Sequence, residues 1–593
     1  RDLRAISPLF KAEASGRLRM PRSGSWEWGE ALVGENFAVA ADIDLTAAAG
    51  AIPGGLTVRP DVKVTGGQLQ LTAASRPDGP DRVLEVRLTS RDLSAVQHAV
   101  DGERPLRWND PFTAWFRGRR GPNRGDRLWI EEARVASPAV EIAATGTVDA
   151  SSVQWTVDID KLVTEAAEVL DLGPVALRGA ARGTLELSNG GAAGGSTARL
   201  SAAFTDFSLS SPGRRAWSDK EITLKAEGVG SPAGAAWLID DAEAEIIADG
   251  DRFKATLAGG AIVDPRAIVR SLAGSAVATV SPWLRTAPDA EAVSVDCSLA
   301  GDLGRWQPRV ESFTGGSGVT LGGTIVQAAG AVTARGNAWQ ITRANVEIEK
   351  LTAKPDGGGW RIEEPRLVAS AAGVIDPAAG LVEVSSAELL TASLSLRTGG
   401  ATLATAARSI PAPSGLLDRI RGKVQWQADV GRLEKWIVPP AAAARWPASG
   451  RAWGTAEILD TPAGLNLLVE VTGNQLAVAR GAAGTPLAGG AAPPQTVWAE
   501  PRASLVVEVT RPLAGDPAAT DSLTINRFAL ESSTLAVTAA GSVSEIASRG
   551  LLDLGGTVAY DWSQMSRLLT PWTGGGVQLV GGGPRPFAVR GPL

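Results

Sequence analysis

A set of landmarks recurs along this chain of 593 residues in one fixed order. The first landmark is an aspartate that ends an apolar stretch and precedes a short helix-like turn. It is found at Asp42, Asp158, Asp296, Asp429 and Asp561, with spacings of 116, 138, 133 and 132 residues. A repeat of this length indicates tandem units, each of which builds one structural module and contacts its neighbours.

Three further landmarks keep the same phase as the aspartates. They are a glycine followed by Thr or Gln, then a tryptophan, and then a strand-like stretch that runs into a second glycine. The first glycines are Gly67, Gly183, Gly323 and Gly454; the tryptophans are Trp108, Trp217, Trp360 and Trp498; the second glycines are Gly146, Gly259, Gly399 and Gly541. The phase predicts four repeat units and part of a fifth, with bounds 1–146, 147–285, 286–420, 421–545 and 546–593.

Apolar and polar residues alternate along most of the chain. In the segment 153–159, for example, Val153, Trp155, Val157 and Ile159 would lie on one face of a strand. Alternation over five to eight residues, bounded by Gly, Pro, Asp or Asn, is the signature of a strand. We therefore expect a mainly β protein, built as an elongated tandem array of antiparallel modules with short helical turns.

The recurring aspartates have a structural explanation. An aspartate between a strand and a helical turn satisfies free backbone N–H groups as an N-cap. We expect Asp42, Asp158, Asp296, Asp429 and Asp561 to be such caps, while a metal-binding or catalytic role is the minor alternative. The glycines are interpreted as turns or bulges.

The rare residues limit the possible chemistry. The chain has one histidine, His98, and one cysteine, Cys297, so a zinc site of the usual ligands and an internal disulfide are excluded. A Ser–His–Asp triad would have to use His98, which lies in an amphipathic stretch. We therefore expect no catalytic site, no metal and no cofactor. The formal net charge of −6 gives no basic footprint for nucleic acid.

An antiparallel sheet can bury its apolar side in two ways. It can pack against a second sheet, or it can curl into a partly open groove with an apolar inner side. A groove would bind hydrocarbon chains, and its predicted lining residues are Val153, Trp155, Val157, Val424, Trp426, Val558 and Tyr560. The 19 tryptophans admit three roles, namely packing, lining acyl chains and stacking on sugars.

The repeated phrases resemble those of the AsmA/TamB-type proteins, whose modules form a repeating β-groove. The resemblance rests on segments such as Thr534–Val543, Thr557–Asp561 and the closing Arg585–Leu593. It implies a curved, partly open groove. It also implies a periplasmic or cell-envelope location, with an inner-membrane anchor outside this sequence, in which no apolar stretch of about 18 residues occurs.

The resemblance implies a non-enzymatic, bridge-like scaffold that carries phospholipid, or another acyl-chain lipid, or assists outer-membrane assembly. Inner- and outer-membrane proteins would be its partners. One alternative is a structural or adhesive β-repeat surface protein, which would have a dry core between two sheets. A carbohydrate-active enzyme is a further alternative and would need two carboxylates facing each other across a cleft.

Overall fold

The computed structural model describes most of the chain. The described residues are 10–16, 37–44, 61–99, 102–108, 112–121, 128–147, 150–169, 175–189, 195–233, 236–263, 284–286, 292–335, 338–376, 381–404, 420–437, 447–480, 495–512, 522–546, 550–561, 563, 566 and 582–592. They form two compact units. Unit 1 comprises Arg1–Ala290 and Gln307–Gly316, and unit 2 comprises Glu291–Trp306 and Ser317–Leu593.

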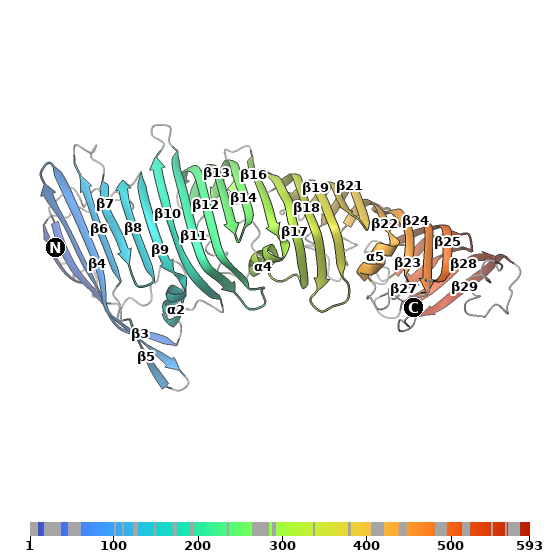
Figure 1. The fold of residues 1–593 in the computed structure, drawn as a ribbon, viewed down its shortest axis with the longest axis horizontal. Coiled ribbons are helices and arrows are strands. Elements are labelled where there is room, and N and C mark those ends of the chain that lie inside the picture. The colour runs from blue at the N-terminus through green and yellow to red at the C-terminus, as the bar shows by residue number, and fades with distance from the viewer. Residues whose placement is uncertain are drawn as a thin grey trace, which may run out of the picture. The chain divides into compact units, whose positions relative to one another are not determined.

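Unit 1 is built from antiparallel strands, most of which pair with the next strand along the chain (Figure 1). They are β1 (Phe10–Gly16), β2 (Phe37–Asp44), β3 (Val62–Asp78), β4 (Asp81–Ala99), β5 (Gly102–Trp108), β6 (Thr113–Arg120), β7 (Trp129–Ala136), β8 (Val140–Thr147), β9 (Ser151–Asp158), β10 (Ala176–Asn189), β11 (Ser196–Ser210), β12 (Trp217–Ala233), β13 (Ala236–Ala248), β14 (Asp251–Val263) and β15 (Leu284–Thr286). Helix α2 (Ile159–Val169) follows β9.

Unit 2 repeats this construction. Its strands are β16 (Val293–Asp302), β17 (Val319–Arg335), β18 (Ala338–Pro355), β19 (Ile362–Asp376), β20 (Leu381–Thr391), β21 (Leu394–Ala404), β22 (Ile420–Asp429), β23 (Ala448–Thr461), β24 (Gly464–Arg480), β25 (Gln495–Arg511), β26 (Ser522–Ser532), β27 (Leu535–Ser544), β28 (Leu551–Asp561) and β29 (Gly582–Pro592). Helix α4 (Leu303–Thr314) follows β16, and α5 (Val430–Ile437) follows β22. The unit boundary falls within α4.

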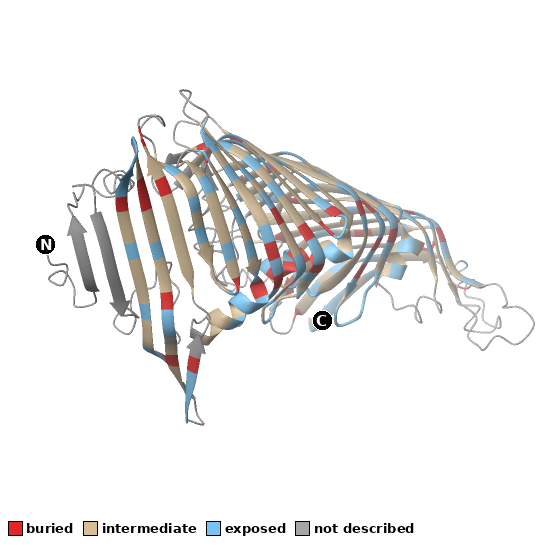
Figure 2. Ribbon diagram, turned by 60° about the vertical axis from the view of Figure 1, so that its left-hand side comes forward, coloured by how far each residue is buried: buried red, intermediate tan, exposed pale blue. Residues whose placement is uncertain are grey.

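The predicted fold class is confirmed. The chain is mainly β, with three short helices among the described residues, and within each unit the antiparallel sheet is curved and does not close on itself. Figure 2 shows that completely buried residues are few and scattered, whereas most strand residues are half-buried or exposed. This burial pattern is that of a sheet with one partly sheltered face.

The repeat has a structural counterpart in chain order. Counted from β3, which follows β1 and β2, six main strands precede each helix: β3, β4 and β6–β9 before α2, then β10–β14 and β16 before α4, and β17–β22 before α5. Strands β23–β28 form a fourth block, while β5 and β15 are short additions that pair with β4 and β14. The sixth strands begin at Ser151, Val293, Ile420 and Leu551, close to the predicted unit bounds. Those bounds themselves stay a prediction.

The second strand of every block contains a non-glycine residue with positive φ: Asp92, Asp206, Lys350 and Gln475, at 48–51°. The facing first strand has a positive-φ glycine at Gly67, Gly179, Gly323 and Gly450. The strand register shifts at each of these glycines, so each pair is a β-bulge. Bulges bend strands and increase their twist, which supplies curvature at four equivalent places. Two predicted landmarks, Gly183 and Gly454, are therefore not the bulge glycines, which lie four residues earlier.

Replacing Gly450 by alanine should destabilise unit 2. Gly450 has a φ of 120°, and an added Cβ would lie 2.7 Å from the Gln475 carbonyl oxygen and 2.9 Å from the Leu476 Cα. Enforcing such a backbone conformation on a residue with a side chain costs about 1–3 kcal/mol. Chemical unfolding followed by circular dichroism should show this loss for Gly450→Ala. The control is Gly555→Ala in β28, where an added Cβ meets nothing within 4 Å. Equal stability of the two variants would contradict the bulge assignment.

Candidate functional site

The strand register gathers apolar side chains on one face of the unit 1 sheet, here called the apolar face. Residues opposite each other on neighbouring antiparallel strands share a face, so cross-strand rows can be followed through the register. One row runs through six residues and a glycine from β8 to β14: Ile142, Trp155, Gly183, Ala202, Leu224, Ile246 and Phe253. The next row contains Ala144, Val153, Leu185, Leu200, Ala226, Ala244 and Ala255.

Unit 2 has an apolar face of the same kind. Its central row runs from β21 to β28 through Leu396, Trp426, Gly454, Val471, Leu505, Leu530, Val537 and Val558. The row beside it contains Val424, Ala456, Val469, Val507, Phe528 and Ala539. Trp426 and Val558, which are 132 positions apart in the sequence, therefore lie in one continuous apolar row.

The opposite face of each sheet, the polar face, carries charge. In unit 1 its central row is Gln154, Thr184, Ser201, Lys225, Glu245 and Lys254. Ion pairs link this row to its neighbours, with Lys254 2.7 Å from Glu243 and Arg252 3.2 Å from Glu245. Exposed pairs of this kind add little stability, so this side is a solvated face.

All seven predicted lining residues lie on the apolar faces. Val153, Trp155 and Val157 occupy neighbouring rows of unit 1, and Val424, Trp426, Val558 and Tyr560 occupy neighbouring rows of unit 2. Each of the seven is half-buried, and the residues between them, such as Gln154, Thr156 and Gln425, are exposed. That these side chains line a groove for a ligand stays a prediction.

The apolar faces do not form the dry core of a sandwich. Among the described residues, the extensive strand–strand contacts join neighbours within a sheet. The largest described side chains with less than 2% exposure are Glu500, Val83, Val293, Asp251 and Ser90. Leu, Ile, Phe and Trp are absent from that described set, although they dominate the interior of closed domains.

Tryptophan and glycine face each other across strands at two equivalent positions of the apolar faces. A Cβ on Gly183 would lie 2.5 Å from the Trp155 indole, and one on Gly454 would lie 3.1 Å from the Trp426 indole. Each indole therefore covers the glycine of the next strand. This arrangement explains why glycine occupies Gly183 and Gly454, the two landmark positions that are not bulges.

The predicted caps divide into three groups. The Asp158 carboxylate accepts a 2.9 Å hydrogen bond from the Lys161 N–H, and Asp429 accepts a 3.0 Å bond from the Arg432 N–H. These contacts confirm the N-caps of α2 and α5. Asp561 accepts a 2.8 Å bond from the Ser563 N–H. Asp42 lies within β2, and the residues after Asp44 lie outside the described part of the chain.

The assignment of Asp296 as a cap is wrong. Asp296 is exposed inside β16, which continues for six more residues to Asp302. Asp302 caps α4, since its carboxylate accepts a 3.0 Å hydrogen bond from the Arg305 N–H. The cap aspartates are thus Asp158, Asp302 and Asp429, one per described helix.

A buried acidic residue on the third strand of three blocks was missed in the sequence. Glu500, 1% exposed, accepts hydrogen bonds from the Ser533 N–H at 3.0 Å and from the hydroxyls of Ser532, Ser533 and Thr534. Glu364 binds the Ala392 N–H at 2.9 Å and the Ser393 hydroxyl. Each carboxylate fastens the turn between the fourth and fifth strands. The signal was an acidic residue two to four positions after Trp498 and Trp360.

In the block that precedes α4 the corresponding acid is Asp219, two positions after Trp217. Its carboxylate binds an arginine, whereas the carboxylates of Glu500 and Glu364 bind hydroxyls. Arg309 of α4 donates to Asp219 at 2.7 and 2.9 Å and to Asp251 at 2.7 Å, and all three side chains are buried in unit 1. Burial alone would lower the pKa of Arg309, but these bonds and charges raise it. Each charge is paired, as buried charges require, so the cluster is structural.

The two scarce groups, His98 and Cys297, lie on different strands of the described chain. His98 is exposed in β4 with its Nδ1 3.3 Å from Glu103, and Cys297 is half-buried in β16 as a free thiol. Among the described residues, no group of three or more His, Cys, Asp or Glu is placed to hold a metal ion.

No protein-family model matches the chain, and neither the curated proteins nor the solved structures include one with significant similarity to it. Within the part of the chain that the structure describes, no helix has the length and apolar character to cross a bilayer. The continuous apolar rows make the apolar faces the principal candidate site.

The Glu500 carboxylate should contribute stability in a pH-dependent way. Burial would raise the pKa of Glu500, but hydrogen bonds from Ser533, Thr534 and Ser532 outweigh it and hold the pKa below its usual range. Its contribution is then complete above the pKa of the unfolded chain, about 4.3, and is lost as the pH falls through the lower folded value.

Glu500→Gln should lower the free energy of unfolding at pH 7 by about 1–3 kcal/mol, because the hydroxyl and N–H donors around this buried site lose their charged acceptor. Urea unfolding from pH 7 to pH 3 should show the gap between wild type and variant narrowing at the acidic end. Glu531→Gln, an exposed neighbour on β26, serves as the control. A gap that does not change with pH would contradict this role.

Proposed function

We propose that the chain is a non-enzymatic scaffold that carries phospholipid, or another acyl-chain lipid, along its apolar sheet faces. The observation that carries the proposal is the apolar row that continues across seven strands in unit 1 and eight in unit 2, whose members are half-buried apart from the buried Ala202. A face of this kind is incompletely covered by the described protein, and an apolar ligand would complete its burial.

Hydrocarbon chains suit such a face energetically. Each methylene removed from water contributes about 0.8 kcal/mol, without any directional partner. The side chains on offer are aliphatic and indole groups without charges, as Val153, Trp155, Leu185 and Leu200 illustrate in unit 1. A polar head group would remain in water at the open side of the curved sheet.

The resemblance to AsmA/TamB-type proteins extends this proposal to the cell envelope. There the chain would lie in the periplasm, attached to the inner membrane, and would move phospholipid toward the outer membrane or assist outer-membrane assembly. Membrane proteins at either end would be its partners. The alternative of a purely structural or adhesive repeat protein makes the opposite prediction, because it needs no bound lipid.

Lipid binding can be tested with substitutions at two neighbouring residues that lie on opposite faces of β9. The chain, purified from bacterial cells without detergent, should contain phospholipid that is detected by mass spectrometry of an organic extract. Trp155→Asp should reduce bound lipid several-fold, because a carboxylate on the apolar face opposes hydrocarbon binding. Thr156→Asp adds the same charge to the exposed polar face and should leave the lipid content unchanged.

Circular dichroism should confirm that both variants are folded. Wild-type protein without phospholipid, or an equal loss of lipid in the two variants, would refute lipid binding at this face.

A further inference from the structure

A hollow of about 520 Å³ lies on the polar face of unit 2, over strands β21 to β24. It is on the side of the sheet away from the proposed lipid site. Its floor follows two register rows, of which the first is Ser395, Gln427, Trp453 and Thr472 and the second is Arg397, Gln425, Thr455 and Glu470. Trp426 and Gly454, between these rows, also line the hollow, but strand alternation assigns the Trp426 side chain to the apolar face. On the polar face the hollow therefore combines the Trp453 indole with amides, hydroxyls and charged groups.

Trp453 is a large apolar residue on the polar face. Its side chain is 41% exposed, while its register partners Gln427 and Thr472 are polar. An indole that is 41% exposed among polar groups contributes less to folding than a buried one, because a large part of its surface remains in water. The Trp426 indole, by contrast, is half-buried on the apolar face, where it covers Gly454.

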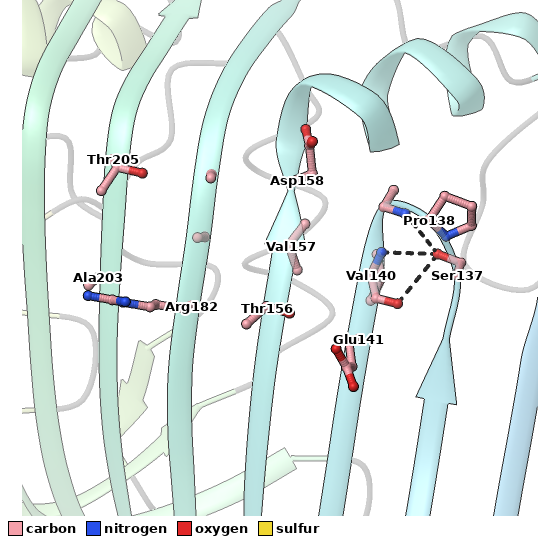
Figure 3. Close-up of a pocket in the computed structure, with 13 residues that line it drawn as sticks. Ser137, Pro138, Val140, Glu141, Thr156, Val157, Asp158, Arg182, Ala203 and Thr205 are labelled. Atoms are coloured by element: carbon pink, nitrogen blue, oxygen red, sulfur yellow. Dashed lines mark hydrogen bonds between the residues drawn. The ribbon is translucent and has the colours of Figure 1, made fainter.

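The repeat itself does not require a tryptophan here. Trp453 follows the cap Asp429 by 24 positions, and Arg182 follows the cap Asp158 by the same interval in unit 1. Thr156 likewise stands where Gln427 stands. Figure 3 shows one of the hollows of unit 1, of about 490 Å³, which is lined by Arg182, Thr156 and Thr205 among others. The same scaffold position thus holds an arginine in one unit and an exposed indole in the other.

The groups around Trp453 are available to a ligand. Gln425 and Gln427 are exposed, and within the described residues their side chains form no hydrogen bond. Each amide offers two donors and one acceptor oxygen. Glu470 is exposed and adds an acceptor, with the Thr455 hydroxyl 3.4 Å away.

The local charges disfavour an anionic ligand. Arg397 is held by Glu388 through two of its nitrogens, each 2.7 Å from one carboxylate oxygen. Lys423 lies 3.5 Å from its register partner Glu457, in the row next to that of Arg397. With these cations paired and Glu470 also present, the hollow lacks the positive excess that phosphate binding needs.

We propose that this hollow binds a neutral carbohydrate chain. A pyranose ring has an apolar C–H surface that fits the electron-rich face of the Trp453 indole. Its hydroxyls both donate and accept hydrogen bonds, which matches the two glutamine amides and the Glu470 carboxylate. The site is independent of the lipid proposal, since it lies on the other face of the sheet.

The test uses the full chain and a panel of neutral hexasaccharides with glucose or N-acetylglucosamine units, measured by isothermal titration calorimetry. At least one hexasaccharide should bind in the micromolar to millimolar range. Trp453→Ala should weaken binding at least tenfold, and Gln425→Ala with Gln427→Ala should weaken it several-fold. Trp453→Phe should retain part of the affinity because it keeps an aromatic face.

Trp129→Ala is the matched control, since Trp129 is 42% exposed on β7 of unit 1 and lies outside the hollow. Because Trp453 and both glutamines are exposed, we expect their variants to fold. Circular dichroism should confirm that each variant is folded. The proposal is overturned if no hexasaccharide binds, or if Trp453→Ala and Trp129→Ala bind the sugar equally well.

Discussion

Antiparallel register is the constraint on which the remaining structure depends. Because side chains alternate between the two faces of a strand, a slip of one residue would move a whole apolar set to the solvated side. The register instead joins Ile142, Trp155 and Leu224 in one unit, and Trp426, Val471 and Val558 in the other, into continuous rows. A sheet with such rows and without a dry core has one face suited to an apolar ligand.

The ends and bends of the strands are fixed by polar contacts that recur with the repeat. Aspartate caps begin the helices, positive-φ pairs such as Gly450 and Gln475 bend the first two strands, and buried acids such as Glu500 fasten a distant turn. The partners of the buried acids differ between blocks, since hydroxyls bind Glu500 whereas Arg309 binds Asp219. The scaffold therefore tolerates changes of local chemistry at equivalent positions, and the exchange of Arg182 for Trp453 is another instance.

The alternation of apolar residues was sufficient to predict most strands and the shared face of the seven named residues, such as Val153 and Trp155. The repeat phase located the caps Asp158 and Asp429 but misplaced a third at Asp296, because β16 runs six residues further before α4 begins. Gly183 and Gly454 were mistaken for bulges because glycine at a strand contact and glycine at a bend look alike in sequence. The fastening role of Glu500 depends on a turn more than 30 residues away, so local pattern could not reveal it.

The most direct test of an acyl-binding apolar face compares two tryptophans on adjacent strands. Trp426 lies on the apolar face, and Trp453 lies on the polar face of the next strand. The measurement is the quenching of tryptophan fluorescence by phospholipid with brominated acyl chains, in wild type, Trp426→Phe and Trp453→Phe. The account predicts that Trp426→Phe loses part of the quenchable fluorescence while Trp453→Phe keeps all of it. Equal quenchable fluorescence in the two variants, or a loss confined to Trp453→Phe, would contradict the account.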